Sequence, residues 1–287
     1  LLPELLSRET VMPVSVAEDG MKLEPDHVYI APPGCQLAIL NGTLHRMDAD
    51  DLAAPKFPID YFFHSLAEDQ QERAICIVLS GTGTDGTLGL KAIKGNSGMA
   101  MVQQPRSAKY AGMPSSAEGT GMVDYVLAPA AMPQQLVAYA KGPFLAGGGI
   151  TAEPSALLAE PMQKMFLLLR HRTGHDFSGY KVSTIRRRIG RRMNVHQIED
   201  PDRYVRFLKE NPQEIDILFN ELLIRVTNFF RDPAAWAALA AEPLKQLLES
   251  RALDASLRAW VPGCAPGEEA DTLAIVLREC QTQSERH

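Results

Sequence analysis

The spacing of apolar residues changes once along this 287-residue chain, close to residue 142. Before that point, short runs of β-forming residues alternate with helical stretches. After it, apolar side chains recur every three or four positions as far as residue 250. The first pattern predicts a parallel sheet with crossover helices, and the second predicts amphipathic helices. Because the two patterns occupy separate blocks, the chain should form more than one domain, as its length also favours.

The first block, residues 1–141, is predicted to form a doubly wound α/β domain. Buried-strand candidates lie at 27–31, 74–79, 98–102 and 122–127. Helix candidates lie at 59–69, 86–94, 115–119 and 132–141. Strands that alternate with helices in this way pair in parallel, with the helices covering the faces of the sheet.

A run of glycine and proline without charge at 142–149 opens a predicted linker, residues 142–154. Residues 155–250 are then predicted to form an all-helical domain. Its apolar residues recur at helical spacing, for example at Ile185, Ile189 and Met193. Two helix starts are marked by an acidic or amide residue followed by proline, at Asn211-Pro212 and Asp232-Pro233.

The last block, residues 251–287, begins with a strand candidate at 257–261. A turn rich in glycine and proline follows, and a helix is predicted from Glu268 to about Cys280. This order is typical of the opening strand-turn-helix of a Rossmann-like domain. The predicted fold class is therefore α/β: a doubly wound domain, then an all-helical domain and the first unit of a Rossmann-like domain.

Composition excludes several classes of protein. Lys and Arg number 29 against 35 Asp and Glu, a net charge of −6, which does not suit a general nucleic-acid-binding chain. The four cysteines lack the spacing of a zinc site or a disulfide framework, so no metal is expected. No apolar stretch approaches the ~20 residues that cross a bilayer, and no secretion signal opens the chain, so we expect a cytoplasmic protein without membrane insertion. Since Leu1 lies within a helical pattern, we also expect a fragment.

The run from Leu79 to Thr87 combines three glycines with polar residues, directly after a buried strand and before a helix. In an open α/β sheet, active sites form at this edge. A carboxylate here, that of Asp85, is suited to orient a histidine for nucleophilic catalysis. An equally weighted alternative is that Asp85 only caps the following helix. A phosphate-binding loop is a third alternative, although the Gly-Lys-Ser/Thr signature is absent.

A basic stripe lies on the helix whose apolar face holds Ile185, Ile189 and Met193. It consists of six cations without an acid among them: Lys181, Arg186, Arg187, Arg188, Arg191 and Arg192. The stripe is a solvated helix face, a docking surface for an acidic protein segment, or a nucleic-acid site. The acidic composition and the lack of interleaved aromatic residues make nucleic acid the weakest of the three.

Two further segments contain candidate binding residues. Before the last helix, Gly263 lets a ligand approach the backbone, whereas Glu268 repels a pyrophosphate. This pair favours a cofactor with an ammonium or sulfonium group, such as S-adenosylmethionine. The alternative is that the acids only complement the helix dipole. Arg231 follows two phenylalanines typical of a core, and Asp232 beside it is an available ion-pair partner.

Three ordered motifs in the first block resemble the catalytic domain of bacterial chemotaxis-receptor methylesterases of the CheB type. They lie at 19–34, 79–86 and 110–114. The resemblance implies that Asp85 is the third member of a Ser-His-Asp triad. It also implies that the backbone N–H of Thr82, where methionine is usual, serves the oxyanion hole. The family's serine and histidine positions would precede Leu1.

Four ordered motifs in the second half resemble the chemotaxis-receptor glutamate O-methyltransferases of the CheR type. They lie at 173–181, 186–193, 226–232 and 263–269. The resemblance implies that S-adenosylmethionine contacts Thr227, Arg231, Gly263 and Glu268, and that Arg231 lies near the transferred methyl group. It also implies that the basic helix faces the methylation helix of a receptor through four arginines: Arg187, Arg188, Arg191 and Arg192.

The second half also departs from this family. Arg225 replaces a common Asn that contacts the cofactor, Pro266 replaces a usual Thr, and Asp271 replaces a usual Tyr. The acidic residue expected to hold the ribose would lie beyond His287.

Together, the two resemblances imply a bifunctional chemotaxis signalling enzyme. One region would methylate receptor glutamates with S-adenosylmethionine, and the other would hydrolyse the methyl esters. The expected partners are a methyl-accepting chemoreceptor-like protein and fused or associated sensor or kinase modules. The alternative is a non-catalytic interaction module built from remnants of both enzymes. Residues 1–287 alone are expected to be incomplete for both activities.

Overall fold

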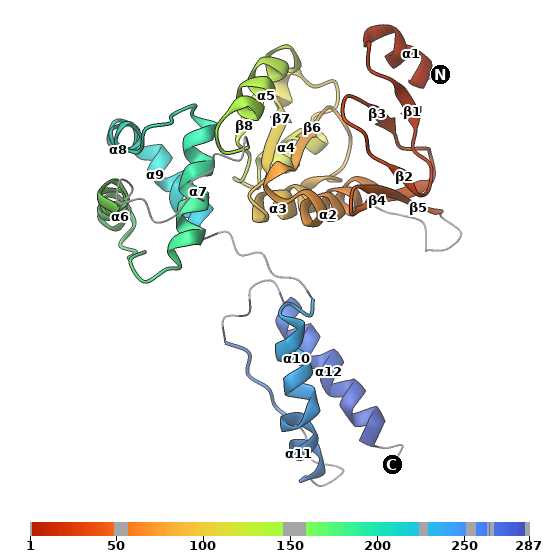
Figure 1. Cartoon of the computed structure of the whole chain (residues 1–287), viewed down its shortest axis with the longest axis vertical. Helices are drawn as coiled ribbons and strands as arrows, with labels where there is room; N and C mark the ends of the chain where they lie inside the picture. Colours follow the sequence, from red (N-terminus) through yellow and green to blue (C-terminus); the bar gives the residue numbers. More distant parts are fainter. Residues whose placement is uncertain are drawn as a thin grey trace. The chain divides into compact units, whose positions relative to one another are not determined.

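The computed structural model describes residues 2–48, 57–145, 159–223, 229–250, 257–262, 264 and 267–284. The chain divides into two compact units, Leu1–Ile224 and Arg225–His287. Figure 1 shows the elements of each unit coloured along the chain. The first unit contains both the α/β region and the helical region that the sequence predicts as separate domains.

A parallel three-stranded sheet in the order β6-β7-β8 forms the centre of the α/β region. Its strands are β6 (Ile75–Val78), β7 (Met99–Gln103) and β8 (Tyr125–Leu127). The accompanying helices are α2 (Pro58–Gln70), α3 (Thr87–Gly95), α4 (Gly112–Glu118) and α5 (Met132–Lys141). Every residue of β7 is buried, as a central strand covered on both faces requires.

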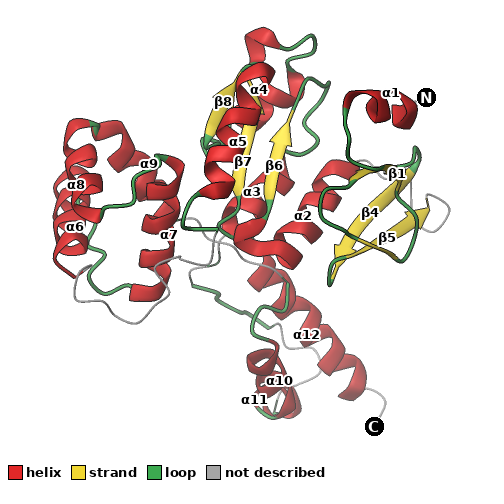
Figure 2. Ribbon diagram, turned by 45° about the horizontal axis from the view of Figure 1, so that its top comes forward, coloured by secondary structure: helices red, strands yellow, loops and turns green. Residues whose placement is uncertain are grey.

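Helices cover both faces of this sheet. On one face, Val102 of β7 belongs to the same buried apolar cluster as Leu90 of α3. On the other face, Met101 of β7 packs in a cluster with Tyr139 of α5. Figure 2 shows α5 beside the three strands. The doubly wound arrangement predicted from the sequence is therefore confirmed.

Ahead of α2, the described residues form two small sheets. The predicted strand at 27–31 is formed as β3 (Val28–Ile30), but it belongs to one of these small sheets and not to the sheet of β6, β7 and β8. The other strands of the two small sheets are not predicted. After α1 (Leu2–Glu9), β1 (Val14–Val16) pairs in parallel with β3. The second sheet is antiparallel and consists of β2 (Met21–Lys22), β5 (Thr43–Asp48) and β4 (Cys35–Leu40). Asn41 and Gly42, both with positive φ, make the two-residue turn between β4 and β5. An Asn-Gly pair is the local signal for such a hairpin. The prediction that the strands of residues 1–141 pair in parallel is therefore corrected for this antiparallel sheet.

Over residues 159–223, the helical region of the first unit consists of α6 (Ala159–Thr173), α7 (Val182–Val195), α8 (Pro201–Glu210) and α9 (Pro212–Leu222). The predicted apolar face of α7 lies in the core of this region. Asn211 precedes the first residue of α9, as predicted. Asp200 begins α8 in the same way, and its carboxylate accepts a hydrogen bond from the N–H of Asp202 at 3.1 Å.

The second unit contains α10 (Pro233–Ala241), α11 (Pro243–Glu249) and α12 (Glu268–Ser284). The helix starts at Pro233 and Glu268 agree with the sequence prediction. The predicted strand at 257–261 is not formed. A β-strand needs backbone hydrogen bonds to a neighbouring strand, and the described part of this unit offers none. The unit begins at Arg225, so α10 and α11 group with α12 and not with the helical region that the sequence extended to residue 250.

The predicted linker at 142–154 is described only as far as Leu145, and its remaining residues lie outside the described residues. Among the helices that the structure describes, none combines the length and the apolar character of a membrane span.

Gly89 lets α3 approach α2. A Cβ atom at this position would overlap the Phe63 side chain and lie 3.0 Å from the carbonyl oxygen of Asp60. We expect Gly89→Ala to lower the stability of the first unit by about 1–3 kcal/mol, because the helices have to move apart. The expected readout is a melting temperature lower by several degrees, measured by circular dichroism.

Gly179→Ala is the matched control, because no atom lies within 4 Å of a Cβ built at Gly179. Its melting temperature should stay within about 2 °C of the wild-type value. Equal melting temperatures for the two variants would contradict the close packing of α2 on α3.

Candidate functional site

The loop after β6 meets the loop after β7 at the carboxyl end of the parallel sheet. The N–H of Gly81 donates to the carbonyl oxygen of Tyr110 at 3.0 Å, and the N–H of Met113 donates to that of Gly81 at 2.9 Å. The N–H of Ser80 donates to Oε1 of Gln103, the last residue of β7, at 2.9 Å. These bonds hold the two loops together at the edge where ligands bind in open α/β sheets.

The tip of the first loop is exposed at this edge. Thr82, Gly83 and Thr84 are all exposed to solvent. Gly112 allows the second loop to touch the first, since a Cβ at Gly112 would lie 3.0 Å from the backbone nitrogen of Gly83. The backbone of Thr82, predicted to serve an oxyanion hole, is therefore at the surface of the sheet edge.

Asp85 lies at the end of the same loop, where its carboxylate accepts three backbone hydrogen bonds. Oδ1 accepts from Asp60 and Gly86, both at 2.9 Å, and Oδ2 accepts from Ile59 at 3.1 Å. Ile59 and Asp60 belong to the first turn of α2, so Asp85 caps α2. The residue that precedes α3 is Gly86, in a left-handed conformation. The alternative that Asp85 caps the helix that follows it, α3, is therefore wrong, because the helix that Asp85 caps is α2.

Asp60, which the sequence analysis did not single out, makes the reciprocal contact. Its buried carboxylate accepts from the N–H of Gly89, in the first turn of α3, at 2.7 Å. Each helix start is thus bound by a carboxylate from the start of the other. The result is a rigid base for the loop and a fixed orientation for the Asp85 carboxylate, which is what orienting an imidazole requires.

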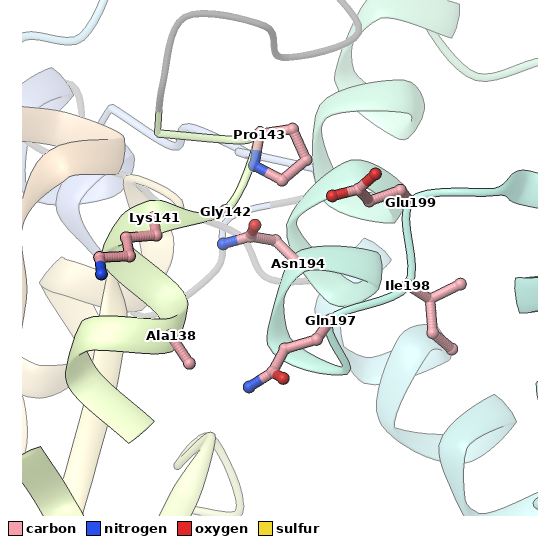
Figure 3. Close-up of a pocket in the computed structure, with 8 residues that line it drawn as sticks. All are labelled: Ala138, Lys141, Gly142, Pro143, Asn194, Gln197, Ile198 and Glu199. Carbon is pink, nitrogen blue, oxygen red and sulfur yellow. The ribbon is translucent and has the colours of Figure 1, made fainter. Parts of the chain in front are cut away.

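A hollow of about 200 Å³ lies between the C-terminal part of α5 and the C-terminal end of α7, each with the residues that follow it. Its lining comes from both segments and consists of Ala138, Lys141, Gly142, Pro143, Asn194, Gln197, Ile198 and Glu199. Figure 3 shows Lys141 and Glu199 on opposite sides of the hollow, with Asn194 pointing toward Gly142. None of the described candidate residues lines it. Within the described ranges, no group of three or more His, Cys, Asp or Glu side chains is placed to bind a metal ion.

Three of the four arginines predicted to bind substrate lie in the interior. Arg188, Arg191 and Arg192 of α7 are buried, and Arg187 is exposed. The resemblance to CheR-type methyltransferases places all four arginines toward the methylation helix of a receptor. That placement is wrong for the three buried arginines, since acids from other elements surround them.

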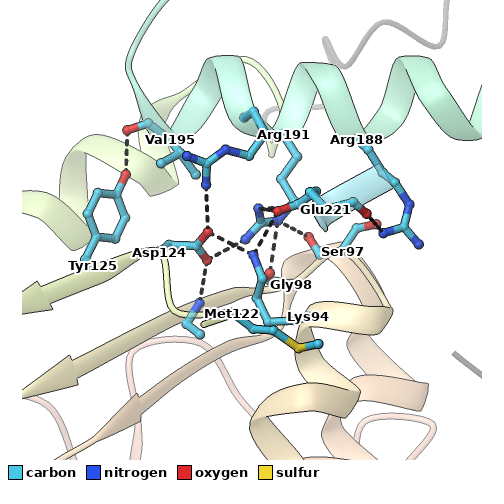
Figure 4. Close-up of polar contacts among 12 residues, drawn as sticks. Lys94, Ser97, Gly98, Met122, Asp124, Tyr125, Arg188, Arg191, Val195 and Glu221 are labelled. Atoms are coloured by element: carbon cyan, nitrogen blue, oxygen red, sulfur yellow. Dashed lines mark hydrogen bonds and ion pairs between the residues drawn. The ribbon is translucent and has the colours of Figure 1, made fainter. Parts of the chain in front are cut away.

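These arginines belong to a buried charge cluster, and Figure 4 labels Arg188 and Arg191 among its members. Arg191 pairs with Glu221 of α9 at 2.8 Å and also with Asp124. Arg192 pairs with Glu214 of α9 at 2.7 Å and with Asp124 at 3.2 Å. The members of the buried charge cluster are Lys94, Asp124, Arg188, Arg191, Arg192, Glu214 and Glu221.

The charges in this cluster stabilise one another. Burial alone would raise the pKa of Glu214, but hydrogen bonds from His196 and Arg192 outweigh burial and hold this pKa at about 2. Burial would also raise the pKa of Asp124, whereas the positive charge of Arg191 and its neighbouring cations lowers it. Both carboxylates are therefore ionised at neutral pH.

Sequence reasoning missed Asp60 and Asp124. Asp124 stands alone among the apolar residues of the predicted strand at 122–127, and a solitary acid in such a run is the signal of a buried polar contact. Asp60 lies in the first turn of a predicted helix, where acids are ordinary, so no local signal points to its contact with Gly89.

In the second unit, the structure describes two of the four predicted cofactor residues. Arg231 is exposed, and its carbonyl oxygen accepts a hydrogen bond from the indole N–H of Trp236 at 2.8 Å. Glu268 opens α12 and is partly buried. Thr227 and Gly263 lie outside the described residues.

Thr272 connects the segment that contains Arg231 to the first turn of α12. The N–H of Phe230 donates to the Thr272 hydroxyl at 3.2 Å, and this hydroxyl donates to the carbonyl oxygen of Glu268 at 2.5 Å. The side-chain Oε2 of Glu268 is buried without a hydrogen-bond partner among the described residues. A buried carboxylate oxygen of this kind suits a cationic or hydrogen-bond-donating ligand group, so Glu268 fits the predicted cofactor.

Comparisons with known proteins assign families to these regions. The sequence model for CheB methylesterase matches residues 1–136. Two further models match the all-alpha domain of CheR methyltransferase at residues 160–223 and the SAM binding domain of CheR methyltransferase at residues 225–287. The chain combines CheB-type and CheR-type sequence in one polypeptide. Both resemblances found in the sequence are confirmed.

Similar proteins match either nearly the whole chain or about half of it. The "uncharacterized 104.1 kDa protein in hypE 3′ region" of Rhodobacter capsulatus is 36% identical over 96% of this chain. The protein-glutamate methylesterase/protein-glutamine glutaminase of group 3 operon of Rhizobium meliloti (strain 1021) is 36% identical over 48% of this chain. The chain spans 31% and 39% of the lengths of these two relatives. The crystal structure of the Thermotoga maritima CheB methylesterase catalytic domain is 30% identical, with a TM-score of 0.43, over 47% of this chain and 74% of that chain.

We expect Asp85→Asn to lower the stability of the first unit by about 1–2 kcal/mol. The substitution replaces one accepting oxygen by an amide NH₂ group, which leaves a backbone N–H of α2 without its acceptor. Thermal unfolding measures the loss. Asp26→Asn is the control, because Asp26 is exposed and its left-handed backbone tolerates asparagine. A melting temperature for Asp85→Asn equal to that of the control would argue against the cap on α2.

The ion pairs of Glu214 predict how the stability of the first unit changes at low pH. Its pKa in the folded protein is about 2, below the usual value of 4.5, so its ionised form adds stability that is complete above about pH 4.5. This stability is lost as the pH falls toward about 2. We expect the melting temperature of the first unit to fall over this range. Glu214→Gln should be less stable at pH 7 and show a shallower fall, and an unchanged slope would contradict the assignment.

Proposed function

We propose that this chain is part of a bifunctional enzyme that methylates glutamate side chains of a chemoreceptor-like protein and hydrolyses the resulting esters. One observation carries the proposal: a CheB methylesterase match at residues 1–136 is followed in the same chain by matches to both CheR domains. Methyl transfer and ester hydrolysis act on the same carboxylate in opposite directions. A polypeptide with both chemistries is suited to set the methylation level of one target.

For hydrolysis, we assign Asp85 as the residue that orients a histidine base. The histidine takes the proton of a serine hydroxyl, whose oxygen attacks the ester carbonyl. Methanol leaves, and water then releases the glutamate from the acyl-enzyme. The backbone hydrogen bonds from α2 support this role because they fix the Asp85 carboxylate. The backbone N–H of Thr82 is assigned to the oxyanion. No residue of this chain is assigned as the serine or the histidine.

For methyl transfer, S-adenosylmethionine supplies a methyl group activated on a sulfonium sulfur. We assign Thr227, Gly263 and Glu268 to holding this cofactor. The buried Oε2 of Glu268 supports the assignment, because a negative group attracts the cationic part of the molecule. Arg231 is assigned to both cofactor and acceptor. Its guanidinium holds a substrate carboxylate in position for attack on the methyl group.

Among the four arginines predicted to bind substrate, Arg187 is exposed. We assign to Arg187 the contact with acidic residues of the receptor's methylation helix and leave the three buried arginines out of substrate binding. A chemoreceptor-like substrate implies a cytoplasmic enzyme, with sensor or kinase modules as further partners. Nucleic acid and membrane insertion form no part of the proposal.

The test uses the product of the complete reading frame that contains these residues, together with a receptor cytoplasmic fragment. Methyl transfer is measured as tritium incorporated from S-[methyl-³H]adenosylmethionine, and hydrolysis as volatile methanol released from the premethylated fragment. We expect Arg231→Ala to lower methyl transfer at least about 100-fold and to leave hydrolysis unchanged. Asp85→Asn should lower hydrolysis by up to about 10⁴-fold and leave methyl transfer unchanged.

Each variant is the control for the other, because a general loss of folding would lower both rates. Normal hydrolysis by Asp85→Asn would limit Asp85 to its capping role. A wild-type protein that catalyses neither reaction while still binding the receptor fragment would favour the non-catalytic interaction module instead.

A further inference from the structure

The CheB-type region and the CheR-type helical region of the first unit share a buried polar interface. Charged, hydroxyl and backbone groups from both regions meet there, and several belong to the buried charge cluster (Figure 4). The CheB-type side supplies Lys94, Ser97, Gly98, Asp124 and Tyr125. The helical side supplies Arg191, Arg192, Val195 and Glu221.

Asp124 lies at the centre of this interface. From its own region, its carboxylate accepts from Nζ of Lys94 at 2.8 Å and from the N–H of Ala100 at 2.9 Å. From the helical region, Arg191 and Arg192 pair with the same carboxylate. The Asp124 side chain is 1% exposed, so water contributes little to stabilising its charge. Of the cations described around Asp124, Lys94 belongs to its own region, whereas Arg191 and Arg192 belong to the helical region.

Arg191 is enclosed by both regions. Its Nε donates to the carbonyl oxygens of Ser97 and Gly98, both at 3.1 Å, in the turn between α3 and β7. Its Nη1 pairs with Glu221 of its own region at 2.8 Å, and the side chain has no exposed surface. Separation of the regions would remove the Asp124 charge and both carbonyl acceptors from one guanidinium.

Smaller contacts extend the interface around the charges. The Tyr125 hydroxyl donates to the carbonyl oxygen of Val195 at 2.6 Å, and the Asn194 amide donates to that of Tyr139 at 3.2 Å. The Val195 side chain is buried in the same apolar cluster as Met101 and Tyr139. A residue of the helical region is thus packed into the core of the CheB-type region.

We propose that the CheB-type region carries a docking surface, centred on Asp124, for the helical region of a CheR-type methyltransferase, and that this surface holds the two regions together without their covalent connection. The partner is defined by its chemistry: a helix with two adjacent arginines, Arg191 and Arg192, backed by glutamates of a second helix. Docking of this kind uses two arginines that the resemblance to CheR-type methyltransferases assigns to a receptor helix. The proposal requires neither catalytic activity.

The test cuts the connection in the folded full chain. A specific protease site is inserted within residues 146–158, the protein is cleaved, and association of the two products is measured by analytical ultracentrifugation. We expect the cleaved products to remain together through size-exclusion chromatography. Because the ion pairs are buried, raising the salt concentration from about 0.1 M to about 0.5 M should change the dissociation constant by less than about threefold.

Asp124→Asn should weaken this association at least about 100-fold, because it leaves Arg191 and Arg192 buried without the negative charge that they share. Tyr125→Phe removes the hydrogen bond to Val195 that crosses the interface and should weaken the association about 5–10-fold. The matched control is Asp216→Asn, which breaks an exposed pair with Arg172 (2.9 Å) inside the helical region. It should change the dissociation constant by less than about twofold.

Circular dichroism of the uncut variants establishes that each is folded, and Tyr125→Phe provides the test if Asp124→Asn does not fold. Separation of folded wild-type products after cleavage would overturn the proposal. Equal affinities for Asp124→Asn and Asp216→Asn, or for Tyr125→Phe and wild type, would overturn it as well. Any of these results leaves the proposed enzymatic activities untouched, since those are measured separately.

Discussion

The ionised carboxylate of Asp124, almost fully removed from water, sets the arrangement of the first unit. A lone charge in a protein interior is strongly unfavourable, so the groups around it have to compensate. Lys94 does so from the CheB-type region, and Arg191 and Arg192 do so from the helical region. Removing any one of them takes away a cation that compensates the buried Asp124 carboxylate. The position of α7 against the sheet is thus fixed by charge as well as by the apolar packing of Val195.

Two other carboxylates, those of Asp60 and Asp85, set the geometry of the candidate esterase edge. The first turns of α2 and α3 have backbone N–H groups without partners inside the helix, as every helix start does. Asp85 accepts from α2 and Asp60 accepts from α3, so each helix start is completed from the other. Neither helix can shift without breaking both contacts. Gly89 makes this arrangement possible, because any side chain there would meet α2. The loop with Thr82 consequently rests on a fixed base.

Local pattern predicts the parts of this structure that depend on local forces. The apolar face of α7 and the strands β6, β7 and β8 lie where periodicity places them. The prediction of a strand at 257–261 fails because a strand depends on a neighbouring strand, and the residues of the segment itself do not show whether such a neighbour is present. The prediction for the buried arginines fails for a related reason. Helical spacing indicates which residues share a face of the helix, but not which other element packs against that face. The acids that pair with Arg191 and Arg192 lie 22 to 68 residues away in sequence. The helix that Asp85 caps likewise begins well before it in the chain.

The docking surface and the candidate esterase edge lie at opposite ends of the parallel strands. Asp124 accepts from Ala100 near the amino end of β7, and the turn that binds Arg191 comes just before that strand. The Asp85 loop lies at the other end, where Gln103 closes β7 and binds Ser80. The five residues of β7 separate these ends by roughly 16 Å of extended chain. Docking through Asp124 therefore leaves the esterase edge uncovered. The helical region of the first unit therefore docks at the end of the strands opposite the Asp85 loop.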